Sequence, residues 1–203
     1  QDPTGALTRR GLLRSLGASG LLLAVGGTGE VWAQAPAQPQ KYGGDAMPGG
    51  LVDNPLVFVS IATDGTVSVV CHRSEMGQGV RTSIPMIVAD ELEADIQRVR
   101  VVQAPGDESI YGNQNTDGSR SIRHSFEPMR RVGAAARAML EAAAAARWGV
   151  PVGEVQARHH EIIHWPTGRK LGFGEVAQAA AALPVPARES LKLKTLDQFR
   201  YIG

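Results

Sequence analysis

The feature that most constrains the fold is a long amphipathic segment over residues 126–148. Its apolar residues recur at spacings of three or four, which predicts a helix with one buried face; they are Met129, Val132, Ala136, Leu140 and Ala143. The side chains of Gly133-Ala134-Ala135 are small, so we expect another element to pack closely against this part of the helix. The sequence therefore predicts a helix that buries one face against a closely packed neighbour.

The ends of this helix carry ordinary start and stop signals. Ser125 can act as the N-cap, and Pro128 is tolerated in a first turn because the amide that it lacks has no helical partner there. Gly149 supplies the residue that commonly ends a helix in a left-handed conformation. We therefore place the helix between Ser125 and Gly149.

The rest of the chain alternates short strands with helices. Two strands joined by Thr63-Asp64-Gly65 read as a β-hairpin, and Pro166-Thr167-Gly168 reads as a further turn. We expect strands at 57–62, 66–71, 99–102, 154–158 and 161–164, and helices at 84–94 and 173–183. Ser83 would cap the first of these helices, with Pro85 in its first turn. This order predicts an α+β fold, a mixed β-sheet with helices packed on one face.

The N-terminus resembles an export signal. Thr8–Arg14 contains the paired Arg9-Arg10 of a twin-arginine signal, Leu16–Val25 is apolar, and Ala33-Gln34-Ala35 is a small-residue cleavage site. The apolar run is shorter than the roughly 20 residues of a membrane span, although an uncleaved signal would tether the chain. We expect a signal at 1–35, a Pro/Gly/Gln-rich linker at 36–55, a domain at 56–203, and a periplasmic location, at the inner membrane if the signal is retained.

Composition excludes several classes of function. The signal holds three arginines and two acids, so the net charge of +1 for the whole chain falls to zero without it, and nothing indicates nucleic-acid binding. Cys71 is the one cysteine, which excludes an internal disulfide and a cysteine-only metal site. Because Cys71 lies on an expected strand, we expect a buried thiol.

The histidines do not form a recognisable metal motif. His159, His160 and His164 cluster in the sequence, while His72 and His124 flank two loops. No carboxylate or cysteine accompanies them at the spacing of a zinc site, so we predict no metal ligands and interpret the His159–His164 cluster as surface residues. Ser119 and Ser121 have no His/Asp pattern around them, which argues against a serine hydrolase.

Two glycine-rich loops, each followed by a helix, are the candidate binding elements. Glycine permits backbone conformations that other residues avoid, and a helix N-terminus favours anions. The candidates are Met76, Gly77, Gln78 and Gly79 in the first loop, and Gly118, Ser119, Arg120 and Ser121 in the second.

Six arginines against two acids between 119 and 147 strengthen the case for an extended anionic ligand across both loops. The competing interpretation of Arg130, Arg137 and Arg147 is a solvated basic helix face.

Two stretches resemble the molybdenum hydroxylases of the xanthine dehydrogenase superfamily. Ser74–Thr82, which contains Glu-Met-Gly-Gln-Gly, and Tyr111–Ser121, followed by Pro128–Arg131, are the matching motifs. The run from Val57 to Gly203 looks like the beginning of the molybdopterin-binding large subunit of the isoquinoline 1-oxidoreductase and membrane-bound aldehyde dehydrogenase type. The motifs are quite specific and cover most of the part after the signal.

The resemblance implies an enzyme that oxidises aldehydes or hydroxylates N-heterocycles with oxygen from water. It implies that Gln78 and neighbouring amides contact the pterin near molybdenum, and that Ser119–Ser121 contact the pterin or its phosphate. The implied cofactor is the molybdenum–molybdopterin cytosine dinucleotide. Implied partners are the remainder of the large subunit, a 2Fe–2S small subunit and a cytochrome c subunit that carries haem c.

The same resemblance marks what this chain lacks. The family's catalytic glutamate lies far beyond position 203, so we assign no catalytic residue here, regard Glu75 as structural, and expect a fragment, a processed piece or one half of a split subunit without turnover of its own. Two alternatives stay open. One is a non-catalytic exported binding module for an anionic or phosphorylated ligand, and the other is a structural assembly domain.

Overall fold

A computed structural model describes residues 50–202, and the expected signal and residues 36–49 of the expected linker lie outside this range. The first sheet has the order β1-β2-β3, formed by Val59–Ile61, Val67–Cys71 and Val99–Gln103. β1 pairs antiparallel with β2, and β2 pairs parallel with β3. The predicted hairpin and the mixed sheet are therefore confirmed. The first strand is shorter than expected because Pro55–Phe58 forms a helical turn, α2, capped by the Asn54 side chain.

Helix α3 (Val80–Leu92) connects the two parallel strands and packs on them. Its predicted start was wrong by four residues: Gly79, in the left-handed conformation, precedes the first turn. Ser83 therefore lies inside the helix, where its hydroxyl donates to the Gly79 carbonyl (3.0 Å), and Pro85 is an interior proline. The apolar face is as predicted, since Ile84, Ile87, Val88 and Leu92 are all buried.

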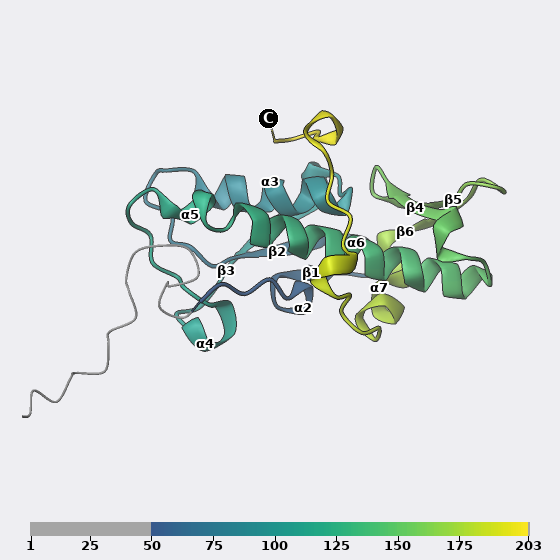
Figure 1. Ribbon diagram of the computed structural model, residues 1–203, viewed down its shortest axis with the longest axis horizontal. Helices are drawn as coiled ribbons and strands as arrows, with labels where there is room; N and C mark the ends of the chain where they lie inside the picture. The colour runs from purple at the N-terminus through teal and green to yellow at the C-terminus, as the bar shows by residue number, and fades with distance from the viewer. Residues whose placement is uncertain (1–49, 203) are drawn as a thin grey trace, which may run out of the picture. The chain divides into compact units, whose positions relative to one another are not determined.

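Helix α6 (Phe126–Trp148) confirms the central prediction. The apolar stripe of Met129, Val132, Ala136, Leu140 and Ala143 is buried, and α6 runs beside α3 (Figure 1). Gly133 lies against α3 so closely that a Cβ built there would be 2.5 Å from the Val88 carbonyl oxygen. Gly149 ends the helix in the left-handed conformation (φ 66°), as expected. Ser125 precedes it but makes no side-chain capping bond.

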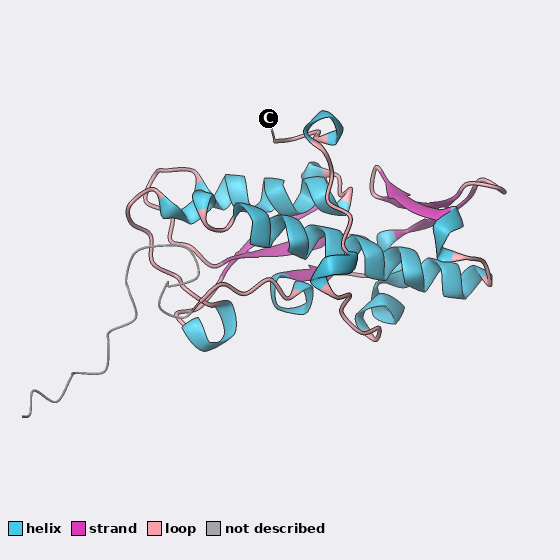
Figure 2. Cartoon of the chain, in the orientation of Figure 1, coloured by secondary structure: helices cyan, strands magenta, loops and turns pink. Residues whose placement is uncertain are grey.

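A second sheet, separate from the first, follows α6 (Figure 2). It is an antiparallel meander of β4 (Val155–Arg158), β5 (Glu161–His164) and β6 (Arg169–Gly172), and β4 packs against α6. The sequence predicted β4 and β5 but not β6, which is short and largely exposed. Helix α7 (Phe173–Ala181) then packs against α6. The α+β class is confirmed, with two sheets where one was expected.

The interpretation of the histidine cluster as surface residues was right only for His159. His159 and His160 form the β4–β5 turn with positive φ angles, but His160 is buried, and its Nδ1 accepts from the Asp95 amide (3.1 Å). His164 is also buried, with its ring nitrogens near Thr167 Oγ1 (2.7 Å) and Glu154 Oε2 (3.0 Å). Each ring is held by hydrogen bonds within the fold.

Three further segments complete the described chain. The segment between β3 and α6 contains two helical turns, α4 (Glu108–Tyr111) and α5 (Arg120–Arg123). Leu51, at the end of the expected linker, forms an isolated antiparallel bridge with Gly112. After Pro184 the chain has no long element, in agreement with the sequence, and contains only the 3₁₀ turns Arg188–Ser190 and Leu196–Gln198. No helix within residues 50–202 has the length and apolarity needed to cross a bilayer.

Two buried residues of different chemistry, Cys71 and His72, lie at the end of β2. Cys71 is buried, as predicted, and burial raises the pKa of its thiol. His72 is 4% exposed, its ring meets the Phe58 ring edge to face at 5.3 Å, and its Nε2 lies 3.4 Å from Ser125 Oγ. Burial, with a smaller contribution from the Arg73 charge, lowers the pKa of His72 to about 3. His72 is therefore neutral in the folded protein.

The close approach at Gly133 predicts a sharp cost for any side chain there. Gly133→Ala should lower the free energy of unfolding by about 1–3 kcal/mol, because the clash with the Val88 carbonyl outweighs alanine's better helix propensity. Urea denaturation of the purified chain measures this. Gly153→Ala is the matched control: an added Cβ meets nothing within 4 Å, and its effect should stay within about 0.5 kcal/mol. Equal stability of the two variants would contradict the packing described.

The buried neutral imidazole predicts a pH dependence with a definite sign. The unfolded chain takes up a proton at His72 below a pH of about 6.5, whereas the folded chain does so only near 3. This contribution to stability is complete above 6.5 and is lost at about 1.4 kcal/mol per pH unit between these values. His72→Gln should flatten the slope of unfolding free energy against pH relative to wild type, and exposed His159→Gln should not. Parallel profiles for His72→Gln and wild type would refute it.

Candidate functional site

The structure brings the two predicted loops together. The Ser74 amide donates to Thr116 Oγ1 (3.0 Å), and the Thr116 hydroxyl donates back to the Ser74 carbonyl (3.2 Å). The Gln114 side chain donates to the His72 carbonyl (3.3 Å). The loop before α3 and the loop before α5 therefore form one continuous surface at the same end of the domain (Figure 1).

Glu75 organises the first loop. Its carboxylate accepts hydrogen bonds from the amides of Gly77 (2.7 Å), Gly79 (2.9 Å) and Arg81 (3.0 Å). The bonds from Arg81 and Gly79 are the largest contributions that lower the pKa of this carboxyl. The side chain thus fills the anion-binding position at the N-terminus of α3, and this part of the expected ligand cradle is occupied by the protein itself. An ionised, fully bonded carboxylate is also a poor general base, which agrees with a structural role.

Gln78 lies on the exposed side of this loop. Its Nε2 donates to the Ser74 carbonyl (2.8 Å) and its Oε1 accepts from the Met76 amide (2.6 Å). Gly77 and Gly79 have φ angles of 95° and 83°, and a Cβ at either position would meet nothing within 4 Å. The glycines are needed for the backbone conformation, and open space lies in front of them. Met76 in the same loop is 70% exposed.

Of the four predicted site residues in the second loop, two are exposed and two are buried. Gly118 and Ser119 are exposed and both have positive φ angles, 51° and 55°, a conformation that is strained for serine. Arg120 (3% exposed) and Ser121 (7%) are buried beneath them. Arg120 forms an ion pair with Asp117. The four residues are therefore close together, but only the first two present themselves to solvent.

Arg73 is the residue that sequence reasoning missed. It is fully buried, and its Nη1 donates to Asn113 Oδ1 (2.7 Å) and to the Asn115 carbonyl. Burial, followed by repulsion from Arg120, lowers the pKa of this guanidinium to about 10. The available signal was its position: a charged residue two positions after the end of β2 and directly before the first glycine loop. Arg73, next to the first loop, is thus joined to the segment before the second loop by hydrogen bonds from its buried side chain.

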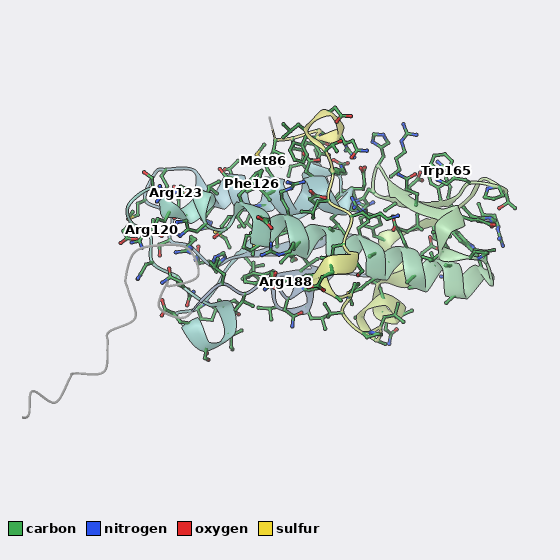
Figure 3. The ribbon with its side chains drawn as sticks, in the orientation of Figure 1. Met86, Arg120, Arg123, Phe126, Trp165 and Arg188 are labelled. Atoms are coloured by element: carbon green, nitrogen blue, oxygen red, sulfur yellow. The ribbon has the colours of Figure 1, made fainter. Side chains whose placement is uncertain are left out.

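The arginines of α6 do not belong to this site. Arg130 pairs with the buried Glu91 (2.7 Å), Arg131 pairs with Asp53 (2.6 Å), and Arg137 donates to the Glu91 carbonyl (2.7 Å). These three arginines bind partners within the fold, in place of the expected anionic ligand or a solvated face. Arg147 is exposed, as the alternative of a solvated face expects, and its Nη1 donates to the Glu175 carbonyl (3.0 Å). They bind α6 to neighbouring segments of the fold. Arg120 and Arg123, on α5, lie at the opposite end of the view from Trp165, which is in the β5–β6 turn (Figure 3).

A cavity of about 940 Å³ lies at a different place in the domain. It is bordered by α6, by the second sheet and by residues 190–200, and none of its lining residues comes from the two glycine loops. Burial raises the pKa of Glu141 in its wall, and that carboxyl accepts from the Ala157 amide (2.8 Å). Among residues 50–202 no three His, Cys, Asp or Glu side chains gather as a metal centre would require.

Comparison with solved structures supports the architecture. The chain matches a copper- and molybdenum-containing carbon monoxide dehydrogenase with a TM-score of 0.51, at 20% identity, over 64% of this chain and 18% of the other. Reconstituted carbon monoxide dehydrogenase from Oligotropha carboxidovorans also gives a TM-score of 0.51, at 23% identity, over 60% and 15%. At these identities the likeness shows the fold.

Sequence relatives identify the family. The chain is 38% identical over 139 residues to the β subunit of isoquinoline 1-oxidoreductase from Brevundimonas diminuta, covering 66% of this chain and 17% of that protein. It is 32% identical to the membrane-bound aldehyde dehydrogenase (pyrroloquinoline-quinone) of Gluconacetobacter polyoxogenes, over 98% of this chain and 25% of that protein. It is 30% identical to one subunit of a nicotinate dehydrogenase from Pseudomonas putida, over 72% and 12%. The chain thus spans at most a quarter of these relatives. A model of the molybdopterin cofactor-binding domain matches residues 27–200, and the chain belongs to that family.

Proposed function

We propose that this domain holds and orients the molybdenum–molybdopterin cofactor of an oxidoreductase that oxidises aldehydes or hydroxylates N-heterocycles. The observation that carries the proposal is the union of the two glycine loops into one surface, with Gln78 exposed on it and buried arginines beneath it. Family membership supports the cofactor. The names of the relatives support the two substrate classes.

The residues present suit a pterin. Gln78 offers an amide that both donates and accepts, and it can exchange its two bonds within the loop for bonds to a heterocycle. Gly118 and Ser119 present exposed backbone and hydroxyl groups on the second loop. Arg73 keeps Nε and Nη2 buried and without partners in the described structure, and such orphaned donors suit an anionic group. When bound, the cofactor supplies the transfer of oxygen from water to carbon, and this chain supplies its position.

The wider assembly is part of the same proposal. The cytosine dinucleotide form of the cofactor, a 2Fe–2S subunit that accepts electrons and a cytochrome c subunit follow from the resemblance of the motifs. Two of the relatives are named as single subunits of their enzymes, which supports a multisubunit assembly. The general base of the reaction is expected in the remainder of the large subunit, since Glu75 is committed to loop amides.

A non-catalytic module that binds an anionic ligand is the second candidate, since the buried donors of Arg73 would serve it equally well. Molybdenum and pterin content separates the two. The proposed function requires both to co-purify with the chain when the remainder of the subunit is co-expressed, whereas an anion-binding module would contain neither.

Gln78→Ala tests the first loop in the complete enzyme. We expect activity or molybdenum occupancy to fall on the order of 10-fold, because an amide beside the cofactor is lost. The free energy of unfolding should change by no more than about 0.5 kcal/mol, because the side chain is exposed. Metal analysis, turnover and urea denaturation measure the three quantities, with exposed Gln97→Ala as the control. Full activity at full molybdenum content would remove Gln78 from the site.

Export by the twin-arginine pathway is a separate part of the proposal, motivated by Arg9-Arg10 and the apolar run after them. Replacing both arginines by lysine should leave the protein in the cytoplasm, because that pathway reads the pair. Cell fractionation with an antibody against the chain measures this. Arg14→Lys is the matched control and should be exported normally; normal export of the double variant would exclude the pathway.

A further inference from the structure

Strand β1 lies at the edge of the first sheet, where it pairs with β2 alone. The Ala62 amide donates to the Thr66 carbonyl (2.9 Å), so these two residues form a hydrogen-bonded pair of the hairpin. Hydrogen-bonded and non-hydrogen-bonded pairs alternate along an antiparallel ladder, and the next pair, Ile61 with Val67, is therefore non-hydrogen-bonded. The amide and carbonyl of Ile61 point away from β2 and have no hydrogen-bond partner within residues 50–202.

A groove of about 680 Å³ lies beside this open edge. Residues of α2, β1, α6 and α7 line it, and α6 contributes Met139 and Leu140. Glu175 is its one charged lining residue, and that carboxylate already accepts from the Gly172 amide (2.7 Å). Leu56, also in the lining, is 51% exposed. The groove therefore suits apolar side chains.

The groove is built into the fold by the position of α7. A Cβ at Gly174 would lie 2.2 Å from the Thr63 carbonyl oxygen, so α7 begins in direct contact with the β1–β2 hairpin. Farther along α7, the residues that line the groove include Ala177, Ala180 and Ala181. Their small side chains leave space in front of a helix whose start is fixed by close packing.

We propose that an extended segment from the remainder of the large subunit adds to β1 as a further strand and places alternate side chains in this groove. In strand addition, backbone hydrogen bonds give affinity and pockets for alternate side chains give specificity. The Ile61 amide and carbonyl supply the first, and the groove supplies the second. An open strand edge beside apolar surface favours aggregation unless something covers it.

The length of the relatives favours this occupant. The chain spans at most a quarter of them, so most of a subunit of that size lies outside these 203 residues. The proposal rests on the proposed function for the existence of that remainder. It requires no cofactor and no residue of the two glycine loops.

Photo-crosslinking identifies the occupant. The full chain is co-expressed with the remainder as a separate polypeptide, and p-benzoylphenylalanine replaces Gln178, an exposed residue of the groove. We expect a crosslink to one segment of the remainder, mapped by mass spectrometry. The same group at exposed Gln97, outside the groove, should not reach that segment. A crosslink to a second copy, to residues 1–49 of this chain or to another subunit, or no crosslink, would overturn the proposal.

Paired variants test the groove and the strand edge separately. Ala181→Arg should weaken co-purification with the remainder at least about 10-fold, because it buries an unpaired charge beneath the added strand. Ala179→Arg, exposed on the same helix but outside the groove, should co-purify as wild type does. Ile61→Pro removes the outward amide and should weaken co-purification several-fold, whereas Ile61→Val should not. Equal co-purification by the two alanine variants would contradict docking in the groove.

Hydrogen exchange of the unaltered protein keeps the test decisive if Ile61→Pro does not fold. The Ile61 amide should exchange at least about 10-fold more slowly when the remainder is bound than in the isolated chain. The Ser60 amide, which points toward β2, should be protected in both. Unchanged exchange at Ile61 would exclude strand addition. Molybdenum content is scored separately: protection of Ile61 without molybdenum would defeat the cofactor proposal alone, and molybdenum without protection would defeat this one alone.

Discussion

The rest of the structure depends on the close contact between α3 and α6 at Gly133. Where a Cβ would lie only 2.5 Å from the Val88 carbonyl oxygen, the two helix backbones approach as closely as the chain allows. That approach fixes the positions of both helices relative to each other. Helix α3 directly follows the first glycine loop, and α6 follows the second loop through the short helix α5. The geometry of the candidate site is therefore set by packing at a residue that contributes nothing to its chemistry.

Acids at the C-terminal end of α3 hold neighbouring segments around this helix pair. Glu91 accepts from Arg130 and from the Lys194 amide, and Glu93 pairs with Lys194 and Arg200. Burial alone would raise the pKa of Asp90, but hydrogen bonds from the backbone of Tyr201 and Arg200 bring it below its usual value. Buried charges of this kind are stable because each one is paired or fully bonded. Arg73 differs because its Nε and Nη2 have no hydrogen-bond partner in the described structure, although the charges of Asp117 and Glu108 act on it.

Much of the fold could be predicted from local pattern. The α6 stripe, the β1–β2 hairpin and the β4–β5 turn were confirmed because each is encoded by residues close together in the chain. The start of α3 was wrong because Glu75, not Ser83, satisfies its first amides, and a carboxylate reaching over several residues leaves no local signal. β6 was missed because Arg169-Lys170 gives no apolar alternation.

By itself the sequence determined the α+β class, the central helix and the two loops that carry the family's motifs, since these rest on periodicity, glycine and short-range spacing. Only the tertiary structure decided what the charged residues do. It showed that Arg130, Arg131 and Arg137 of α6 bind partners within the fold. It also showed that Glu75 fills the N-terminus of α3 and that Arg73 is buried with one edge unused. The physical reason is that the role of a charge depends on its burial and on partners tens of residues away, and neither is written in its local sequence.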